Sequence, residues 1–404
     1  MRAPTVRLAA VDFRIDDKTM ASDCLPLHAK GFDIDVLPDG REALIALKSH
    51  AYHGIIAGMD IPEMDTVRFF SLVRDKIPQS LRIALLRPDE RNRVIDVFGL
   101  VHQFIDAPCD PKTTVEGLRR TCLRYGMLTD LNLRRIVADM TVIPSYPSLY
   151  FALLDELAHP HDDLSRIGAV VSQDVGLTAR IMRLINAPFF GLVRHINDPA
   201  EAVAYLGIET VKGLVLSTHV FSRYEQALLP GFSVERVWAQ SLQVALCARE
   251  LATDAGLPKE TREMAFLAGI LHDIGLIMTA ANHPDDYRSI SRLTKSEGMT
   301  TFEAERSVMG VSHEQVGAMI LGSWGLPPDV VDAVLYHHVP SAAPDEFRDN
   351  PILRLVHVAD AIVDSGAKTR GEASDFDQPF LASMGASADT DRWRTVCHRV
   401  LSRR

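Results

Sequence analysis

A histidine followed by an aspartate, His272 and Asp273, interrupts an otherwise apolar stretch that begins at Ala265. An imidazole or a carboxylate is costly to bury without a partner, so both side chains need a reason to lie there. Neutral imidazoles and ionised carboxylates bind divalent metals, and one hypothesis is therefore a metal site that hydrolyses phosphate esters. The other hypothesis is a buried pair that hydrogen-bonds to itself and to neighbouring backbone.

More side chains of the same kind follow along the chain. They are His313, the adjacent His337 and His338, and Asp360. Together with His272 and Asp273 they could hold one divalent ion such as Fe, Mn or Zn. The segments that carry them have helical period and are separated by prolines, so we expect an all-α region beyond residue 138.

The composition bounds the class of protein. A length of 404 residues predicts two or three domains, and a 47% hydrophobic and 24% charged composition is typical of a globular chain. The net charge of −10 argues against binding of nucleic acid driven by charge. Five scattered cysteines without a CxxC pair favour a reducing cytoplasm. We expect no signal peptide, because residues 1–7 lack an apolar core, and no membrane insertion, because His272 and Asp273 interrupt the longest apolar stretch.

The first 125 residues alternate short apolar runs with amphipathic segments. The runs 6–13, 33–37, 54–59, 82–86 and 102–105 are expected strands, and the segments 19–30, 40–49, 67–76, 90–98 and 113–125 are expected helices. Alternation of this kind predicts a parallel sheet. Five strands and five helices match the count of a flavodoxin-like fold.

Three motifs mark this segment: Ala10-Val11-Asp12, Asp39-Gly40-Arg41-Glu42-Ala43-Leu44 and Ile61-Pro62-Glu63-Met64-Asp65. On these motifs the segment resembles the receiver domain of two-component response regulators, which implies a CheY-like five-stranded sheet. The resemblance also implies where phosphorylation chemistry would lie. The phosphoacceptor aspartate is Gly58 here, and the second acidic Mg²⁺ ligand, next to Asp12, is Phe13. The expected hydroxyl residue is Leu86 and the expected lysine is Ala107.

Asp60 is an alternative phosphoacceptor, since it lies two residues from Gly58 and would point to the same side of an extended strand. We expect it in the loop beyond the strand, with no basic or hydroxyl group left to respond to its phosphorylation. The segment is therefore interpreted as a degenerate receiver, a pseudo-receiver that has kept its sheet for protein contacts such as dimerisation.

A connector of mixed charge, residues 126–138, is expected to be helical. Beyond it, the run SQDVGLTARIMRLINAPFFG (residues 172–191) and AVAYLG (residues 202–207) resemble the HDOD domain, a bacterial signalling relative of the HD phosphohydrolases. We assign this domain to residues 139–345 and a helical extension that completes it to residues 346–404. The two motifs themselves are interpreted as architecture, with Leu177, Ile181 and Leu184 on one apolar helix face. Glu305 is expected to brace the loop that carries His313.

The resemblance to HD enzymes implies metal ligands at the six positions introduced above, and an earlier histidine that completes the set. That position is Gln240, whose amide oxygen is a weak, neutral ligand. The subgroup that cleaves cyclic di-GMP has a lysine after its His-Asp-Ile-Gly motif, and this chain has Leu276 there. The site is thus predicted to be vestigial, with no catalytic residue and no required cofactor.

These observations predict a cytoplasmic bacterial signalling protein of a two-component type, built from a degenerate receiver and an HDOD domain. We expect it to act by binding other signalling proteins, and a second copy of itself, rather than by turnover. The alternative is a metal-dependent phosphohydrolase that acts on a nucleotide or a cyclic dinucleotide. A regulator gated by phosphorylation of Asp60 or Asp12 is a third possibility.

Overall fold

The computed structural model divides the chain into two compact units. One contains Met1–Asp130 with Ile320–Pro328, and the other contains Leu131–Met319 with Asp329–Arg404. The structure describes residues 6–11, 32–49, 54–77, 80–87, 103–106, 164–173, 196–224, 232–323, 326–367, 376–383 and 389–402, with single residues between them. Asp12, Phe13, Ala107, the expected helices 19–30 and 113–125, and most of 90–98 and of the 126–138 connector lie outside these ranges.

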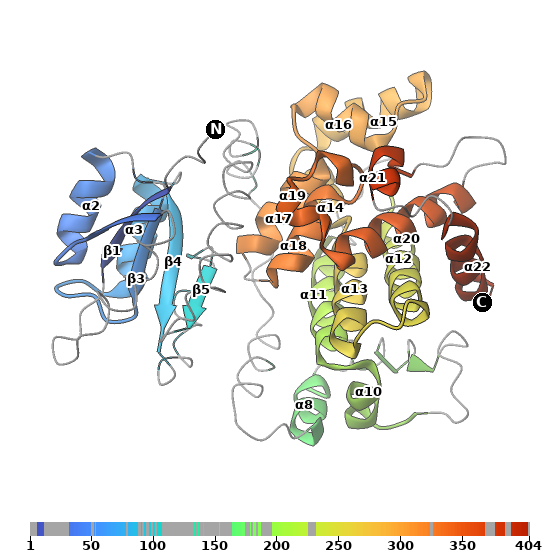
Figure 1. Cartoon of the computed structure of the whole chain (residues 1–404), viewed down its shortest axis with the longest axis horizontal. Coiled ribbons are helices and arrows are strands. Elements are labelled where there is room, and N and C mark those ends of the chain that lie inside the picture. Colours follow the sequence, from blue (N-terminus) through green and yellow to red (C-terminus); the bar gives the residue numbers. More distant parts are fainter. Residues whose placement is uncertain are drawn as a thin grey trace. The chain divides into compact units, whose positions relative to one another are not determined.

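A parallel sheet forms the centre of the first unit (Figure 1). Its strands are β1 (Val6–Val11), β2 (Phe32–Val36), β3 (Gly54–Gly58), β4 (Leu81–Leu86) and β5 (Gln103–Asp106), in the order β2-β1-β3-β4-β5. Every residue of β3 and β4 is buried, as expected for inner strands of a parallel sheet covered on both faces. The prediction of a parallel sheet in this part of the chain is confirmed.

Two described helices, α2 (Gly40–Ser49) and α3 (Thr66–Lys76), belong to this unit. Apolar side chains of both, among them Leu47 and Phe69, share one core with Ile55 of β3. Helix α3 begins after Asp65, whose carboxylate accepts a hydrogen bond from the Arg68 amide at 2.9 Å. Both helices lie within one residue of the bounds expected from the sequence.

The carboxyl ends of the central strands carry the positions that matter for phosphorylation. Gly58 ends β3 and Leu86 ends β4, where its side chain is buried. Asp60 lies in the following loop, as expected, but the expectation that no basic group is near it is wrong. Arg93 forms an ion pair with Asp60 at 2.7 Å and also donates to the Met59 carbonyl at 2.9 Å. Sequence reasoning missed this contact because the two residues are 33 positions apart.

The second unit is helical. Its described elements are α8 (Leu164–Val171), α10 (Pro199–Leu206), α11 (Ile208–Tyr224), α12 (Val234–Asp254), α13 (Lys259–Leu271), α14 (Ile274–Asn282), α15 (Pro284–Glu297), α16 (Thr301–Met309), α17 (His313–Ser323), α18 (Pro328–Tyr336), η3 (Pro340–Ala342), α19 (Asp345–Arg348), α20 (Pro351–Ala367), α21 (Gln378–Ser383) and α22 (Thr390–Leu401). The last four residues of α17 and the first residue of α18 belong to the first unit. Helix α13 packs against α11, α12 and α20, and α12 packs against α11, α13, α20 and α22, so these two helices form the centre of this unit (Figure 1). The all-α expectation for the part beyond residue 138 is confirmed for the described residues.

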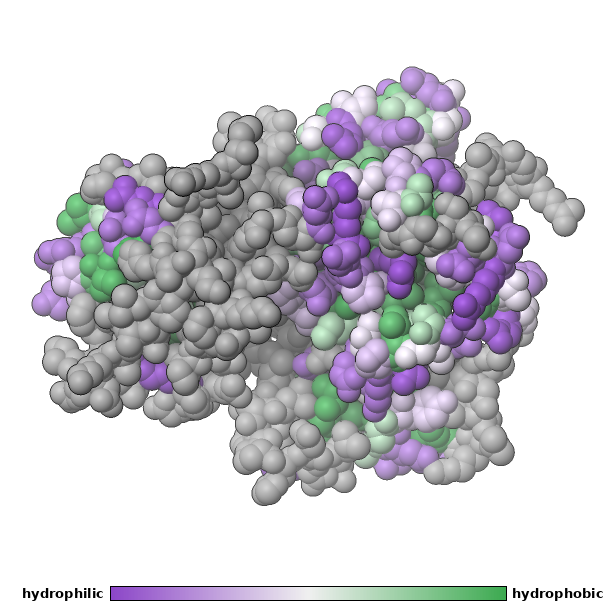
Figure 2. All heavy atoms as spheres, viewed as in Figure 1, coloured by the Kyte–Doolittle hydropathy of each residue, from purple (hydrophilic) through white to green (hydrophobic). Residues whose placement is uncertain are grey.

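The apolar stretch around the His-Asp pair forms two helices, α13 and α14, with His272 and Asp273 at the turn between them. Lys259–Asn282 is the one described segment long and apolar enough to cross a membrane, and 83% of its most apolar window is buried inside the unit. Core helices of globular domains pass the same test. Hydrophilic side chains dominate the described surface of this unit on the face shown in Figure 2.

Candidate metal site

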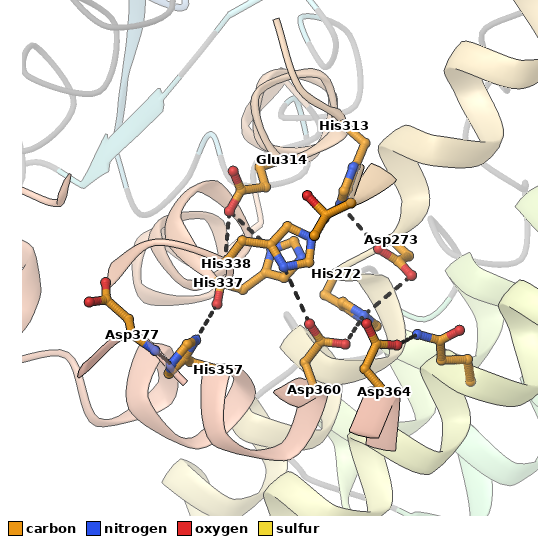
Figure 3. A network of polar contacts seen from close by, with 12 residues as sticks. His272, Asp273, His313, Glu314, His337, His338, His357, Asp360, Asp364 and Asp377 are labelled. Atoms are coloured by element: carbon orange, nitrogen blue, oxygen red, sulfur yellow. Dashed lines mark hydrogen bonds and ion pairs between the residues drawn. The ribbon is translucent and has the colours of Figure 1, made fainter. Parts of the chain in front are cut away.

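The turn between α13 and α14 places His272 and Asp273 in the core. The Nδ1 atom of His272 donates to the Gly269 carbonyl at 2.8 Å, because a carbonyl oxygen can only accept. Its Nε2 atom lies 3.3 Å from Asp360 and 3.4 Å from Asp273, without the geometry of a hydrogen bond to either. The imidazole therefore presents Nε2 to two carboxylates (Figure 3).

Glu305, on α16, holds His313 at the start of α17. One oxygen of the buried Glu305 carboxylate accepts from the His313 amide at 2.8 Å and from its Nδ1 atom at 2.7 Å. The prediction that Glu305 braces this histidine is confirmed. The opposite ring atom, Nε2, lies 3.3 Å from Asp273 and 3.1 Å from Nε2 of His338.

The adjacent histidines His337 and His338 follow the last turn of α18. His337 donates from Nδ1 to the Val334 carbonyl at 2.8 Å, and its buried Nε2 atom has no hydrogen-bond partner among the described residues. The backbone amide of His338 donates to the buried carboxylate of Glu314 at 2.8 Å. His357, on α20, donates from Nδ1 to the His337 carbonyl at 2.6 Å. These contacts fix the ring of His337 and the backbone of both histidines.

Helix α20 supplies Asp360 and, one turn later, Asp364. Asp360 reaches His272 and, at 3.5 Å, Nδ1 of His338. Gln240, on α12, occupies the position where the resemblance implies a histidine, and its amide donates to Asp364 at 2.6 Å. The amide is thus hydrogen-bonded to a carboxylate, at a position where an imidazole would offer a metal its lone pair.

The charges of the cluster follow from burial and contact. Burial opposes a charge on His272, but Asp273 and then Asp360 outweigh it and raise its pKa to about 9. Burial likewise opposes a charge on His313, and Glu305 and Asp273 raise its pKa well above the ordinary value. Burial and the neighbouring histidines lower the pKa of His337. The cluster therefore contains both protonated and neutral imidazoles near pH 7.

We expect the stability of the metal-free protein to depend on pH through His272. Its pKa is about 9 when folded and 6.5 ordinarily, so its contribution is complete below pH 6.5 and is lost as the pH rises toward 9. The free energy of unfolding should fall over this window, by up to about 1.4 kcal/mol per pH unit for one proton. Urea unfolding with a chelator present measures it, and a His272→Gln variant should show a smaller slope. An equal slope in both proteins would contradict the assignment.

A cavity of about 870 Å³ adjoins the cluster. Asp273, His313, His338 and Asp360 line part of it. Gln240 and Leu276 line it too, which places both of the positions expected to depart from the catalytic pattern beside the same space. A cavity of this volume can hold a small molecule.

The donor set fits a divalent metal ion. Ligand atoms of His313, His337 and His338 lie within 4.8 Å of one another, and so do those of His272, Asp273 and His337. Among the described residues the buried Nε2 atom of His337 has no hydrogen-bond partner, which is costly unless something binds it. The structure thus brings together all six residues that the sequence proposed as ligands.

Three contributors to the site were missed by the sequence reasoning. Glu314 and His357 hold the adjacent histidines, and Asp364 binds Gln240. Asp364 and His357 left a usable signal, because they lie four residues after and three residues before Asp360 and so on the same helix face. The contacts of Glu314 and His357 depend on tertiary packing.

The helical unit and its buried histidine and aspartate cluster define the class of domain to which this part of the chain belongs. Residues 143–340 match the family model described as the HDOD domain, so this segment is an HDOD domain.

Solved structures share the fold. An HDOD domain protein of unknown function from Geobacter sulfurreducens aligns with a TM-score of 0.53 and 23% identity, over 68% of this chain and 97% of that chain. A candidate phosphohydrolase from Shewanella amazonensis SB2B aligns with the same score and identity, over 68% and 96% of the two chains. A candidate signal transduction protein from Marinobacter aquaeolei VT8 aligns with a TM-score of 0.53 and 18% identity, over 85% of this chain and 84% of that chain.

An uncharacterized protein of Treponema pallidum (strain Nichols) is 25% identical over 228 residues. The match covers 55% of this chain and 42% of that protein, so the chain spans less than half the length of this curated relative.

Proposed function

We propose that this chain is a signal-transduction protein whose HDOD domain acts by binding rather than by phosphodiester hydrolysis. The observation that carries the proposal is the contact of Gln240 with Asp364 at 2.6 Å. An amide that donates to a carboxylate stands in the place of an imidazole ligand, so the first position of a two-metal centre lacks a strong donor. Leu276 lines the same cavity where a phosphate-binding lysine would be needed for cyclic di-GMP.

We propose that residues 1–125, in the N-terminal unit, form a degenerate receiver domain. The strand order β2-β1-β3-β4-β5 supports it, because flavodoxin-like folds have this order. Gly58 and Leu86, at the ends of β3 and β4, have no group that accepts or senses a phosphoryl group. The ion pair of Asp60 with Arg93 neutralises the alternative acceptor. We propose that this unit offers a protein-binding surface for signalling partners or a second copy.

The proposed organisation continues with a connector at 126–138, the HDOD domain at 139–345 and an extension at 346–404. Helix α20 of the extension supports this, since it packs on α12 and α13 and supplies Asp360 to the cluster. We propose a cytoplasmic location for the whole protein, on the basis of its cysteine usage.

A metal-dependent phosphohydrolase is the second candidate. The observation that favours it is the position of Asp273, whose two oxygens face His272 and His313 at 3.4 and 3.3 Å, as a ligand bridging two metals would. A metal bound there would polarise a phosphate ester and activate water.

Hydrolysis assays of metal-loaded protein separate the two candidates. We expect protein supplied with Fe²⁺, Mn²⁺ or Zn²⁺ to cleave bis(p-nitrophenyl) phosphate and cyclic di-GMP no faster than an Asp273→Ala variant. The physical reason is the missing imidazole at Gln240. Turnover in the unaltered protein that disappears in Asp273→Ala would overturn the binding role and establish the hydrolase.

A further inference from the structure

A short segment of the C-terminal extension, residues 376–383, lies beyond the residues 143–340 that match the HDOD family model. We call it the strap. It contains helix α21, and its apolar side chains Phe376, Phe380 and Leu381 are buried in the helical unit. The Arg394 guanidinium of α22 lies 5.6 Å from the centre of the Phe376 ring. The strap is therefore a packed element of the helical unit.

Asp377 ties the strap to the turn that follows the adjacent histidines. One oxygen of its carboxylate accepts a hydrogen bond from the Ser341 amide in η3 at 2.7 Å, and the other accepts from the Phe380 amide in α21 at 3.2 Å. The Arg348 guanidinium donates to the Ser341 carbonyl at 2.9 Å. The turn is thus held at both backbone groups of one residue.

His357 connects the strap to His337. Its Nδ1 atom donates to the His337 carbonyl at 2.6 Å, and its Nε2 atom accepts from the Asp377 amide at 3.0 Å (Figure 3). An amide can only donate and a carbonyl can only accept, so the ring carries its proton on Nδ1. The Phe376 and Phe380 rings meet the His357 ring at an edge, with centroids 6.3 and 6.1 Å away. The strap therefore fixes His357 and, through it, the main chain of His337.

Both contacts of the strap act on the wall of the 870 Å³ cavity. His357 lines the cavity, and so does Val339, which directly precedes η3. His338 lines it as well, with 27% of its side chain exposed, whereas the neighbouring His337 is fully buried. A movement of η3 would carry Val339 with it and change the exposure of His338.

We propose that the strap controls access to this cavity. In the docked state Asp377 holds η3, and Val339 stays in the cavity wall; when Asp377 releases Ser341, the turn moves outward and His338 becomes accessible. The contact is only partly buried, so water can replace it, and such a local opening costs less than global unfolding. Asp377 is a positioning residue, because it acts through Ser341 and His357. The inference goes beyond the proposed function, since access matters equally for a ligand that is bound and for one that is hydrolysed.

Modification of histidines by diethyl pyrocarbonate, read out by mass spectrometry of peptides, tests the proposal in the full-length protein with a chelator present. The reagent acylates neutral imidazoles that it can reach. We expect Asp377→Ala to raise the rate of modification of His338 by at least about tenfold, the effect of losing a hydrogen bond to a charged acceptor. His272 is fully buried and reports global unfolding, so its rate should stay unchanged. An unchanged rate at His338 would overturn the proposal.

Two further variants separate the strap from a general loosening of the extension. Asp377→Asn keeps an oxygen that can accept from the Ser341 amide and cap α21, so its rate at His338 should stay within about threefold of the unaltered protein. Asp254→Ala removes another carboxylate that holds the extension, since Asp254 accepts from Arg392 of α22 at 2.8 Å. Asp254 ends α12, whereas the residues of α12 that line the cavity lie near its start, so the rate should not change. Equal rises in Asp254→Ala and Asp377→Ala would overturn the role of the strap.

Hydrogen exchange in the unaltered protein decides the question if Asp377→Ala does not fold. The amides of η3 and of the strap should open together, and at least about tenfold more readily than those of the central helix α13. Protection equal to that of α13 would show that the strap opens only when the whole domain unfolds, and would overturn the proposal.

These outcomes are separable from those of the hydrolysis assay. Phosphodiester turnover together with strap-controlled modification of His338 would overturn the proposed binding role and leave the strap standing. Absence of turnover, together with a rate at His338 that Asp377→Ala does not change, would overturn the strap alone.

Discussion

Replacing Glu305 with glutamine is expected to lower the free energy of unfolding of the helical unit by about 3 kcal/mol, as for other buried ion pairs that lose one partner. The carboxylate is fully buried and accepts two hydrogen bonds from His313 with the same oxygen. Without its charge, the His313 imidazolium remains buried beside Asp273 alone. Urea unfolding followed by tryptophan fluorescence measures the change, because Trp238 and Trp393 lie in the helical unit.

Glu303 offers a matched control on the same helix. It is exposed, and its carboxylate accepts from the Thr300 amide at 2.9 Å in the capping box that begins α16. Glu303→Gln removes the same charge but keeps a side chain able to cap, so we expect a loss below about 1 kcal/mol. If both variants lost the same stability, the interpretation of Glu305 as the buried partner of His313 would be wrong.

The sequence was sufficient to predict the ligand types of the site, because imidazoles and carboxylates in apolar helical segments are conspicuous. His272, His313 and Asp360 were each proposed as ligands, and the structure places them in one cluster. Which nitrogens are free could not be predicted. That distinction depends on Nδ1 contacts such as His337 with Val334, and on the approach of His338 to His313, both of which require the packed structure.

In the N-terminal unit the positions of the described elements could be predicted, but an electrostatic contact between them could not. The positions of the five strands and of helices α2 and α3 could be predicted to within two residues, since buried runs such as β3 and β4 are mostly apolar. Alternation of strands and helices also predicted parallel pairing. The contact of Arg93 with Asp60 could not be predicted, because an arginine in a polar segment carries no sign of its partner. Electrostatic contacts between loops are set by tertiary structure.

Gly275→Ala, which adds one methyl group, is expected to lower the free energy of unfolding of the helical unit by about 3 kcal/mol, at the upper end of the cost of overpacking a core. A Cβ atom there would lie 2.0 Å from the His313 carbonyl oxygen and 2.6 Å from the Gly317 amide nitrogen. Both are backbone atoms at the start of α17, so they cannot turn away as a side chain would. Helices α14 and α17 would have to separate, and His313 would move away from Asp273.

Gly256→Ala is the control for Gly275→Ala. Gly256 has a φ of 68° and nothing within 4 Å of the Cβ position, so alanine there meets only backbone strain, about 1 kcal/mol. Urea unfolding by tryptophan fluorescence compares the two variants. Because His313 lies beside Asp273, Gly275→Ala should also raise the apparent dissociation constant for Fe²⁺, whereas Gly256→Ala should leave it unchanged. A Gly275→Ala protein with unaltered stability would show that α14 and α17 do not approach this closely in solution.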